Sequence, residues 1–195
     1  MELEDDVPCT LSLDTLFVHS GEPGRVRRSE GVPTVQPLYT STTYLYEDIS
    51  ALDRASGGQT QGYVYAQCGN PNVAALEEAL TRVECGAGAL VCGSGMAAIH
   101  AALLAAGVGP GKKVLASRAL YGASLELLET AFAAVQAEIV LRDLSHPDAW
   151  RAVYEERPDV VYVEALSNPL VQTIDLTALS AAAQVVGAVS VIDNT

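Results

Sequence analysis

The stretch that most constrains the fold is residues 91–105, VCGSGMAAIHAALLA. The apolar run 88–92 predicts a buried strand, and residues 96–106 have helical spacing that stops at Gly107. A tight turn of Gly93, Ser94 and Gly95 joins them. A turn of this kind leaves backbone N–H groups free at the positive end of a helix dipole, which suits a phosphate. A plain turn, in which the glycines only permit close packing, explains the stretch equally well.

From residue 70 onward, strand patterns alternate with helix patterns. Asn70 is predicted to cap a helix that has Pro71 at its first position. Further strands are predicted at 113–117, 138–141, 159–164 and 188–192, and further helices at 122–135, 147–156 and 176–186. Because the strands are mainly apolar, this rhythm predicts an α/β fold with a mostly parallel sheet covered by helices on both faces. Ligands bind such sheets at the carboxyl ends of the strands.

The first 62 residues lack this regularity. Short helices are predicted only at about 11–19 and 49–55, and glycine and proline are frequent between them. So long an irregular segment is unusual in a compact domain, but its tyrosines and aliphatic residues argue against plain disorder. We therefore predict an N-terminal arm of residues 1–62 that lies on another subunit, followed by a domain of residues 63–195.

The amino-acid composition argues against several classes of binding partner. The net charge of −13, from 11 basic and 24 acidic residues, disfavours nucleic acids and anionic membranes. The longest uncharged stretch, 176–192, is interrupted by polar residues, so we interpret it as a helix and a strand rather than a membrane span. The acidic N-terminus lacks the features of a signal peptide. The four cysteines are scattered without a CxxC pair, which predicts reduced thiols, no metal site and a cytoplasmic protein.

Polar and aromatic residues gather at the predicted carboxyl ends of the strands. Tyr121, Glu164, Asn168 and Asp193 each lie at or shortly after such an end. With the glycine-serine turn, they supply N–H donors for a phosphate, a ring for stacking, an amide and a carboxylate. This set fits a flat phosphorylated pyridinium. Each residue also has a structural explanation, such as packing, helix capping or a turn, so only their combination favours a ligand site.

Several motifs, in this order along the chain, resemble the Cys/Met-metabolism pyridoxal-phosphate enzymes, which include cystathionine γ-synthase, cystathionine γ-lyase, methionine γ-lyase and O-acylhomoserine sulfhydrylase. The motifs are LDTLFVHSGEP, VPTVQPLYTSTTY, YVYAQCGNPN, CGSGMAAI, LYGAS, EALSNP and VIDNT. The resemblance runs from about residue 13 to residue 195. It implies an incomplete large domain of a fold-type I transferase, pyridoxal 5'-phosphate as cofactor, and a sulfur amino acid or O-acylhomoserine as substrate.

The resemblance also implies roles for individual residues. Gly95 and Met96, beside Ser94, would give backbone N–H groups to the phosphate. Tyr121 would stack on the pyridine ring and take part in proton transfer. Asp193 would pair with the protonated pyridine nitrogen and so keep the ring an electron sink.

Asn168 would lie near the ring hydroxyl or the substrate carboxylate. Tyr65 would reach the phosphate of a neighbouring subunit, in a homodimer or homotetramer built through the N-terminal arm. Gln67 stands where the family usually has an arginine, and a neutral amide makes no charge-assisted bidentate contact, so we expect cofactor binding weaker by roughly 1.5–3 kcal/mol. The lysines of the chain are Lys112 and Lys113, at a strand entrance, so the family's Schiff-base lysine is absent.

We therefore predict a truncated front part of a protein of sulfur amino acid metabolism, which performs γ-elimination or γ-replacement on cystathionine, methionine or O-acylhomoserine (trans-sulfuration). The 195-residue chain alone is predicted to be inactive. The alternative is a non-catalytic, truncated or degenerate paralogue that acts only in binding or assembly. A nucleotide-binding α/β domain is a third interpretation, disfavoured because G-x-G-x-x-G and Walker A patterns are missing.

Overall fold

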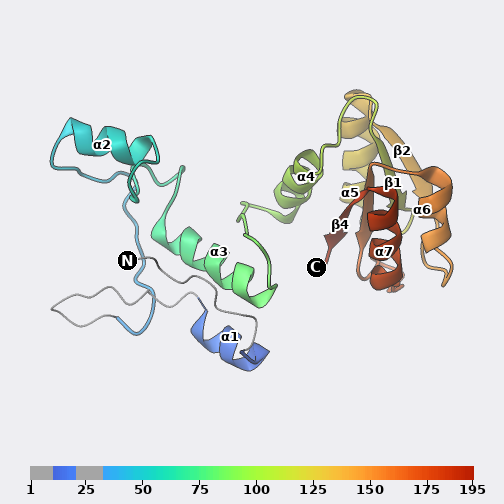
Figure 1. Cartoon of the computed structure of the whole chain (residues 1–195), viewed down its shortest axis with the longest axis horizontal. Coiled ribbons are helices and arrows are strands. Elements are labelled where there is room, and N and C mark those ends of the chain that lie inside the picture. Colours follow the sequence, from blue (N-terminus) through green and yellow to red (C-terminus); the bar gives the residue numbers. More distant parts are fainter. Residues whose placement is uncertain (1–10, 21–32) are drawn as a thin grey trace. The chain divides into compact units, whose positions relative to one another are not determined.

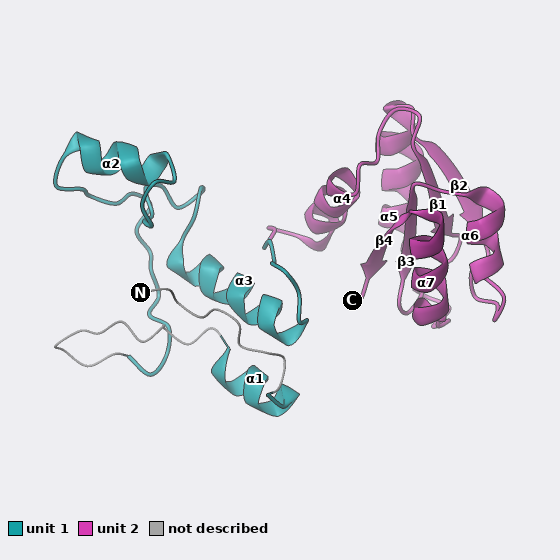
Figure 2. Ribbon diagram, in the orientation of Figure 1, with its two compact units in different colours: residues 1–91 teal, residues 92–195 magenta. Residues whose placement is uncertain are grey.

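The computed structural model describes residues 11–20 and 33–195 (Figure 1). The chain divides into two compact units, residues 1–91 and residues 92–195 (Figure 2). Among the described residues, no helix is long and apolar enough to cross a membrane.

The described part of the first unit contains the helices α1 (Leu13–His19), α2 (Ile49–Ser56) and α3 (Pro71–Val83). Each begins at a polar residue whose side chain accepts a hydrogen bond from an N–H of the first turn. These caps are Ser12, Asp48 and Asn70. Pro71 occupies the first turn of α3, where its missing N–H costs nothing, as the sequence predicts.

The described segments before α2 and between α2 and α3 are irregular, and hydrogen bonds fix them. The side chain of Asn72 accepts from the N–H of Tyr39 at 2.8 Å and donates to the carbonyl of Pro37 at 2.7 Å. The N–H of Ala66 donates to the carbonyl of Thr42 at 2.8 Å. These bonds attach residues 37–42 to the start of α3 and to the segment before it.

The second unit contains a four-stranded parallel sheet with the strand order β2-β1-β3-β4. Its strands are β1 (Lys113–Ser117), β2 (Glu138–Arg142), β3 (Val160–Glu164) and β4 (Val189–Asp193). The central strands β1 and β3 are almost completely buried, as expected for parallel strands covered on both faces. The α/β fold with a parallel sheet is therefore confirmed.

Helices cover both faces of this sheet (Figure 2). They are α4 (Gly95–Ala105), α5 (Gly122–Glu126), the π-helical segment η1 (Leu127–Phe132), α6 (Trp150–Glu156) and α7 (Leu176–Val186). Alternate strand residues enter two separate cores. Val114 and Tyr162 pack with Phe132 of η1, whereas Leu115 and Val161 pack with α6 and α7 on the other face.

Some sequence predictions are wrong in detail. Residues 88–92 form no strand, because a strand needs a neighbour to share its backbone hydrogen bonds, and the N–H of Val91 instead donates to the Glu77 carboxylate at 3.0 Å. The predicted helix 122–135 changes to a π-helical segment after Glu126, and the helix predicted from residue 147 begins at Trp150.

The expectation of reduced thiols holds for only part of the described chain. Cys68 and Cys92 carry free thiols. Cys85 is disulfide-bonded, so the prediction is wrong at that position.

Candidate active site

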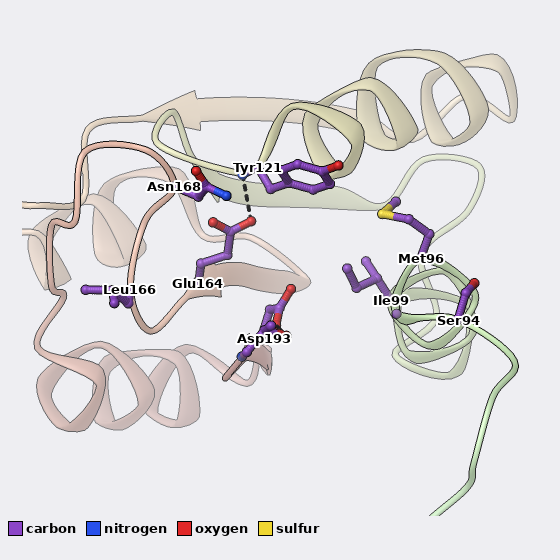
Figure 3. A pocket seen from close by; sticks show the side chains of 10 residues that line it. Ser94, Met96, Ile99, Tyr121, Glu164, Leu166, Asn168 and Asp193 are labelled. Atoms are coloured by element: carbon purple, nitrogen blue, oxygen red, sulfur yellow. Dashed lines mark hydrogen bonds between the residues drawn. The ribbon is translucent and has the colours of Figure 1, made fainter.

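A pocket of about 430 Å³ lies in the second unit, at the carboxyl ends of β3 and β4 (Figure 3). Its volume is typical of small-molecule sites. The predicted site residues of this unit all line it: Ser94, Gly95, Met96, Tyr121, Asn168 and Asp193. The structure thus brings together residues that are spread over about half of the chain. Tyr65 and Gln67 belong to the first unit and do not line this pocket.

One wall of the pocket is the start of α4. Ser94 caps this helix, and its hydroxyl oxygen accepts a hydrogen bond from the N–H of Ala97 at 3.1 Å. The N–H groups of Gly95 and Met96 precede the first intrahelical donor, so they are available to a ligand at the positive helix end. A Cβ at Gly95 would meet no atom within 4 Å, so there is open space beside this backbone.

Tyr121 supplies an aromatic ring. It follows β1 and directly precedes α5, and its side chain is 50% exposed. In Figure 3 the ring lies above Glu164 and faces the space toward α4. Its backbone N–H donates to Oε1 of Glu164 at 2.7 Å. A ring that is half exposed on a hydrogen-bonded backbone can stack on a planar ligand.

Two carboxylates end neighbouring strands at the pocket. Glu164 and Asp193 are register partners in β3 and β4. Oδ1 of Asp193 accepts from the N–H of Thr195 at 3.0 Å and from its hydroxyl at 2.6 Å. Burial raises the pKa of Glu164, the charge of Asp193 raises it further, and hydrogen bonds from the N–H groups of Tyr121 and Asn168 lower it. Because no lysine or arginine of residues 11–20 and 33–195 lines the pocket, these carboxylates favour a ligand that presents a positive group to them.

Asn168 lies in the loop that follows β3. A bridge between Leu166 and Thr173 closes this loop, and the Ser167 hydroxyl accepts from the N–H of Gln172 at 2.9 Å. The Asn168–Pro169 bond is cis. Asn168 is thus part of an ordered loop whose side chains reach the rim of the pocket (Figure 3).

Both lysines lie at the other edge of the sheet, where β1 begins. Lys112 pairs with Asp159 at 2.7 Å, and Lys113 pairs with Glu138 at 3.1 Å. Neither lysine lines the pocket. Their interpretation as surface residues agrees with this position.

The pocket also contains residues to which the sequence assigned no role. Ile99 enters from α4 and Leu166 from the loop after β3, so part of the lining is apolar. Helical spacing could have identified Ile99, because it lies one turn after Gly95. The sequence predicts that Glu164 lies at the carboxyl end of a strand, but it does not indicate which backbone N–H groups donate to the carboxylate.

The groups that line the pocket fit pyridoxal phosphate. Free N–H groups at a helix start suit its phosphate, an exposed ring suits its pyridine face, and a carboxylate suits a protonated ring nitrogen. Among the described residues, no group of three or more His, Cys, Asp or Glu side chains could hold a metal ion.

Comparisons with known proteins agree with this geometry. The chain is 33% identical over 192 residues to an O-acetyl-L-homoserine sulfhydrylase of Leptospira meyeri, and 32% identical over 161 residues to a cystathionine gamma-synthase of Escherichia coli. These matches cover 98% and 83% of the chain, but only 42% and 39% of the two relatives. The chain therefore spans less than half the length of the curated relatives it matches.

Solved structures show the same fold. A cystathionine gamma synthase from Xanthomonas oryzae, in complex with cystathionine, superposes with a TM-score of 0.79 at 28% identity, over 95% of the chain and 45% of that structure. An O-acetylhomoserine (thiol)-lyase candidate from Campylobacter jejuni, which contains N'-pyridoxyl-lysine-5'-monophosphate, gives a TM-score of 0.79 at 27% identity, over 95% of the chain and 44% of that structure. The family profile described as Cys/Met metabolism PLP-dependent enzyme matches residues 14–195. This chain belongs to the family of pyridoxal-phosphate-dependent enzymes of cysteine and methionine metabolism.

Proposed function

We propose that the second unit holds pyridoxal phosphate in the pocket, as part of an enzyme that performs γ-elimination or γ-replacement on cystathionine, methionine or O-acylhomoserine. One observation carries this proposal: a helix start, an exposed ring and a carboxylate meet in one pocket of about 430 Å³. The activities named for the relatives support the substrate class. When bound, the cofactor supplies an electron sink beside the α-carbon of an amino acid.

The start of α4 provides the phosphate site in this proposal. Gly95 and Met96 donate backbone N–H groups, and the helix dipole favours the negative charge. The Ser94 oxygen accepts from the N–H of Ala97, so its own O–H group remains able to donate to a phosphate oxygen.

Tyr121 and Asp193 orient the ring. The half-exposed ring of Tyr121 stacks on the pyridine and shields one face from water. Both hydrogen bonds from Thr195 go to Oδ1 of Asp193, which leaves Oδ2 to accept from a protonated ring nitrogen. Asn168, on the rim above Glu164, is placed to donate to the ring hydroxyl or to a substrate carboxylate.

The first unit contributes to assembly in this proposal. Tyr65 is 42% exposed, and Gln67 is also exposed, so both are accessible to a neighbouring subunit. Large apolar side chains at Leu38 and Leu45 are 87% and 102% exposed, which is costly in water and favours burial against another copy. A homodimer or homotetramer built through the arm of residues 1–62, next to a cofactor domain of residues 63–195, and a cytoplasmic location complete the proposal.

Equilibrium binding tests the cofactor site. Pyridoxamine 5'-phosphate is the suitable probe, because it lacks the aldehyde that would react with Lys112 and Lys113. We expect Asp193→Asn to weaken binding roughly tenfold or more, as for the loss of one hydrogen bond to a charged group. Asp148→Asn removes the same charge from the surface near α6 and should leave the dissociation constant unchanged. Equal effects of the two substitutions would contradict the proposal.

A second candidate is a binding or assembly subunit without turnover. Gln67, which stands where the family usually has a phosphate-binding arginine, favours it. The protein isolated at its natural length separates the two candidates. Turnover of cystathionine or O-acetylhomoserine supports the enzyme, whereas binding of the probe without turnover supports the subunit.

A further inference from the structure

Ile99 is a pocket residue to which the proposed function gives no role. It comes from α4, one helical turn after Gly95, and it is half-buried. Part of its side chain packs on the core that contains Phe132, and the rest lines the pocket. In Figure 3 the side chain extends from α4 into the space between this helix and Asp193. An apolar surface therefore borders the region between the two groups that are proposed to hold the cofactor.

The proposed anchors of the cofactor determine where its ring would lie. The phosphate site is the start of α4, at Gly95 and Met96, and the partner of the ring nitrogen is Asp193 at the end of β4. The helix α4 and the strand β4 contact each other within the second unit. A ligand that reaches both anchors would therefore have its ring beside Ile99. Tyr121 borders the same pocket from the segment between β1 and α5.

We propose that Ile99 is a further cofactor-binding residue, whose side chain forms an apolar floor for the pyridine ring on the side away from Tyr121. This inference rests on the proposed function. A flat ring has two faces, and Tyr121 can cover only one of them. Ile99 covers the other face with an aliphatic surface and excludes water from it. With less water nearby, the charge-assisted hydrogen bond between the ring nitrogen and Asp193 is stronger.

The other aliphatic residues of the pocket lining are placed differently. Leu166 is 46% exposed in the loop after β3, and in Figure 3 it lies on the far side of Glu164 from α4. Met96 lies at the proposed phosphate site, where its backbone N–H group is the donor. Among the described lining residues, Ile99 is thus the aliphatic side chain that faces the proposed ring position.

A purely structural role for Ile99 predicts a different outcome, and Ile139 provides the matched control. Ile139, on β2, is also half-buried and packs on the same core, but it does not line the pocket. Truncation of either side chain removes the same atoms beside this core, so both variants should lose stability. Truncation of Ile99 alone also removes the floor of the ring site.

Two probes separate ring binding from phosphate binding: pyridoxamine 5'-phosphate, and inorganic phosphate measured as its competitor. We expect Ile99→Ala to weaken binding of pyridoxamine 5'-phosphate roughly tenfold, because most of the aliphatic surface under the ring is lost. The affinity for inorganic phosphate should not change, because this ion contacts only the start of α4. Ile139→Ala should leave the affinities for both probes unchanged.

The milder substitution Ile99→Val keeps most of the core packing, so it tests the inference even if Ile99→Ala does not fold. It removes a single carbon atom from the side chain. We therefore expect binding of pyridoxamine 5'-phosphate to weaken roughly threefold, with the affinity of Ile139→Val unchanged.

The outcomes distinguish this inference from the proposed function. If the unsubstituted chain does not bind pyridoxamine 5'-phosphate, the proposed function is wrong, and the ring site is wrong with it. If the unsubstituted chain binds the probe and the Ile99 variants bind it equally well, the inference is wrong while the cofactor site stands. Equal losses of affinity for pyridoxamine 5'-phosphate and inorganic phosphate would also overturn the inference, because Ile99 would then only shape the start of α4.

Discussion

Removing one hydroxyl from the core of the second unit should stabilise it. Tyr162 is fully buried in β3, and its hydroxyl has no hydrogen-bond partner among the described residues. The same is true of the Ser124 hydroxyl in α5. Burial raises the pKa of Tyr162 to about 12, the nearby Ser124 hydroxyl lowers it, and the charges of Asp193 and Glu164 raise it. Tyr162 thus strongly favours its neutral form over the phenolate, but its hydroxyl lacks a hydrogen-bond partner among the described residues.

The magnitude follows from the cost of an unsatisfied buried polar group, about 1–3 kcal/mol. The expected gain for Tyr162→Phe is about 1 kcal/mol, the lower end of this range. The ring stays, so no large cavity forms. Urea unfolding, followed by the fluorescence of Trp150, the single tryptophan, reports on this unit. The midpoint should rise by about 0.3–1 M.

The pH dependence gives an internal check. The pKa of Tyr162 in the folded state lies above its unfolded value of about 10. Below pH 10 both states keep the phenol proton. As the pH rises from about 10 toward 12, the unfolded chain loses this proton first, so the free energy of unfolding of the unsubstituted chain falls. The advantage of Tyr162→Phe should therefore grow above about pH 10. Tyr121→Phe, the same change on a half-exposed ring, should stay within about 0.5 kcal/mol. A midpoint that falls for Tyr162→Phe would refute the reasoning, because the hydroxyl would then have a partner.

Three further predictions concern packing, backbone and charge. Leu115→Ala, at a fully buried position of β1, should lower the free energy of unfolding by about 2–5 kcal/mol in urea titrations. Gly187→Ala should cost about 1 kcal/mol in the same assay, because this residue ends α7 with a φ of +79°. The hydrogen bonds from Lys112 and Lys113 lower the pKa of Asp159, so thermal melts should show Asp159→Asn as less stable than the unsubstituted chain at pH 7. That difference should vanish as the pH falls below about 3.9 and through the lowered pKa.

Local sequence patterns predicted most helices and strands of the second unit, because the residues that begin, end or fill each element identify it. Asp175 caps α7 and Gly187 ends it, so this helix matches its prediction residue for residue. Strand β3 is apolar as far as Glu164, as expected for a strand that is buried on both faces. These signals lie within a few residues of the element they define, so one sequence is enough to interpret them.

The failures concern contacts that are distant in sequence. Residues 88–92 have the composition of a buried strand, but Leu90 is 76% exposed because no neighbouring strand pairs with them. The π-helical segment after Glu126 buries Leu128 and Phe132 in the core, and sequence periodicity does not distinguish such a segment from an α-helix. Glu164 itself is evident in the sequence, but the N–H group that donates to its carboxylate belongs to Tyr121, 43 positions away.

The register between β3 and β4 also decides on which face of the sheet Asp193 lies. Glu164 and Asp193 face each other because Tyr162 and Val191 do so two residues earlier. Side chains alternate between the faces of a strand, so a slip of β4 by one residue would turn Asp193 away from the pocket and Val191 away from its core together. The apolar pattern that aligns the strands therefore also places Asp193 on the pocket side of the sheet. A chain whose core is packed correctly has this carboxylate on the correct face of β4.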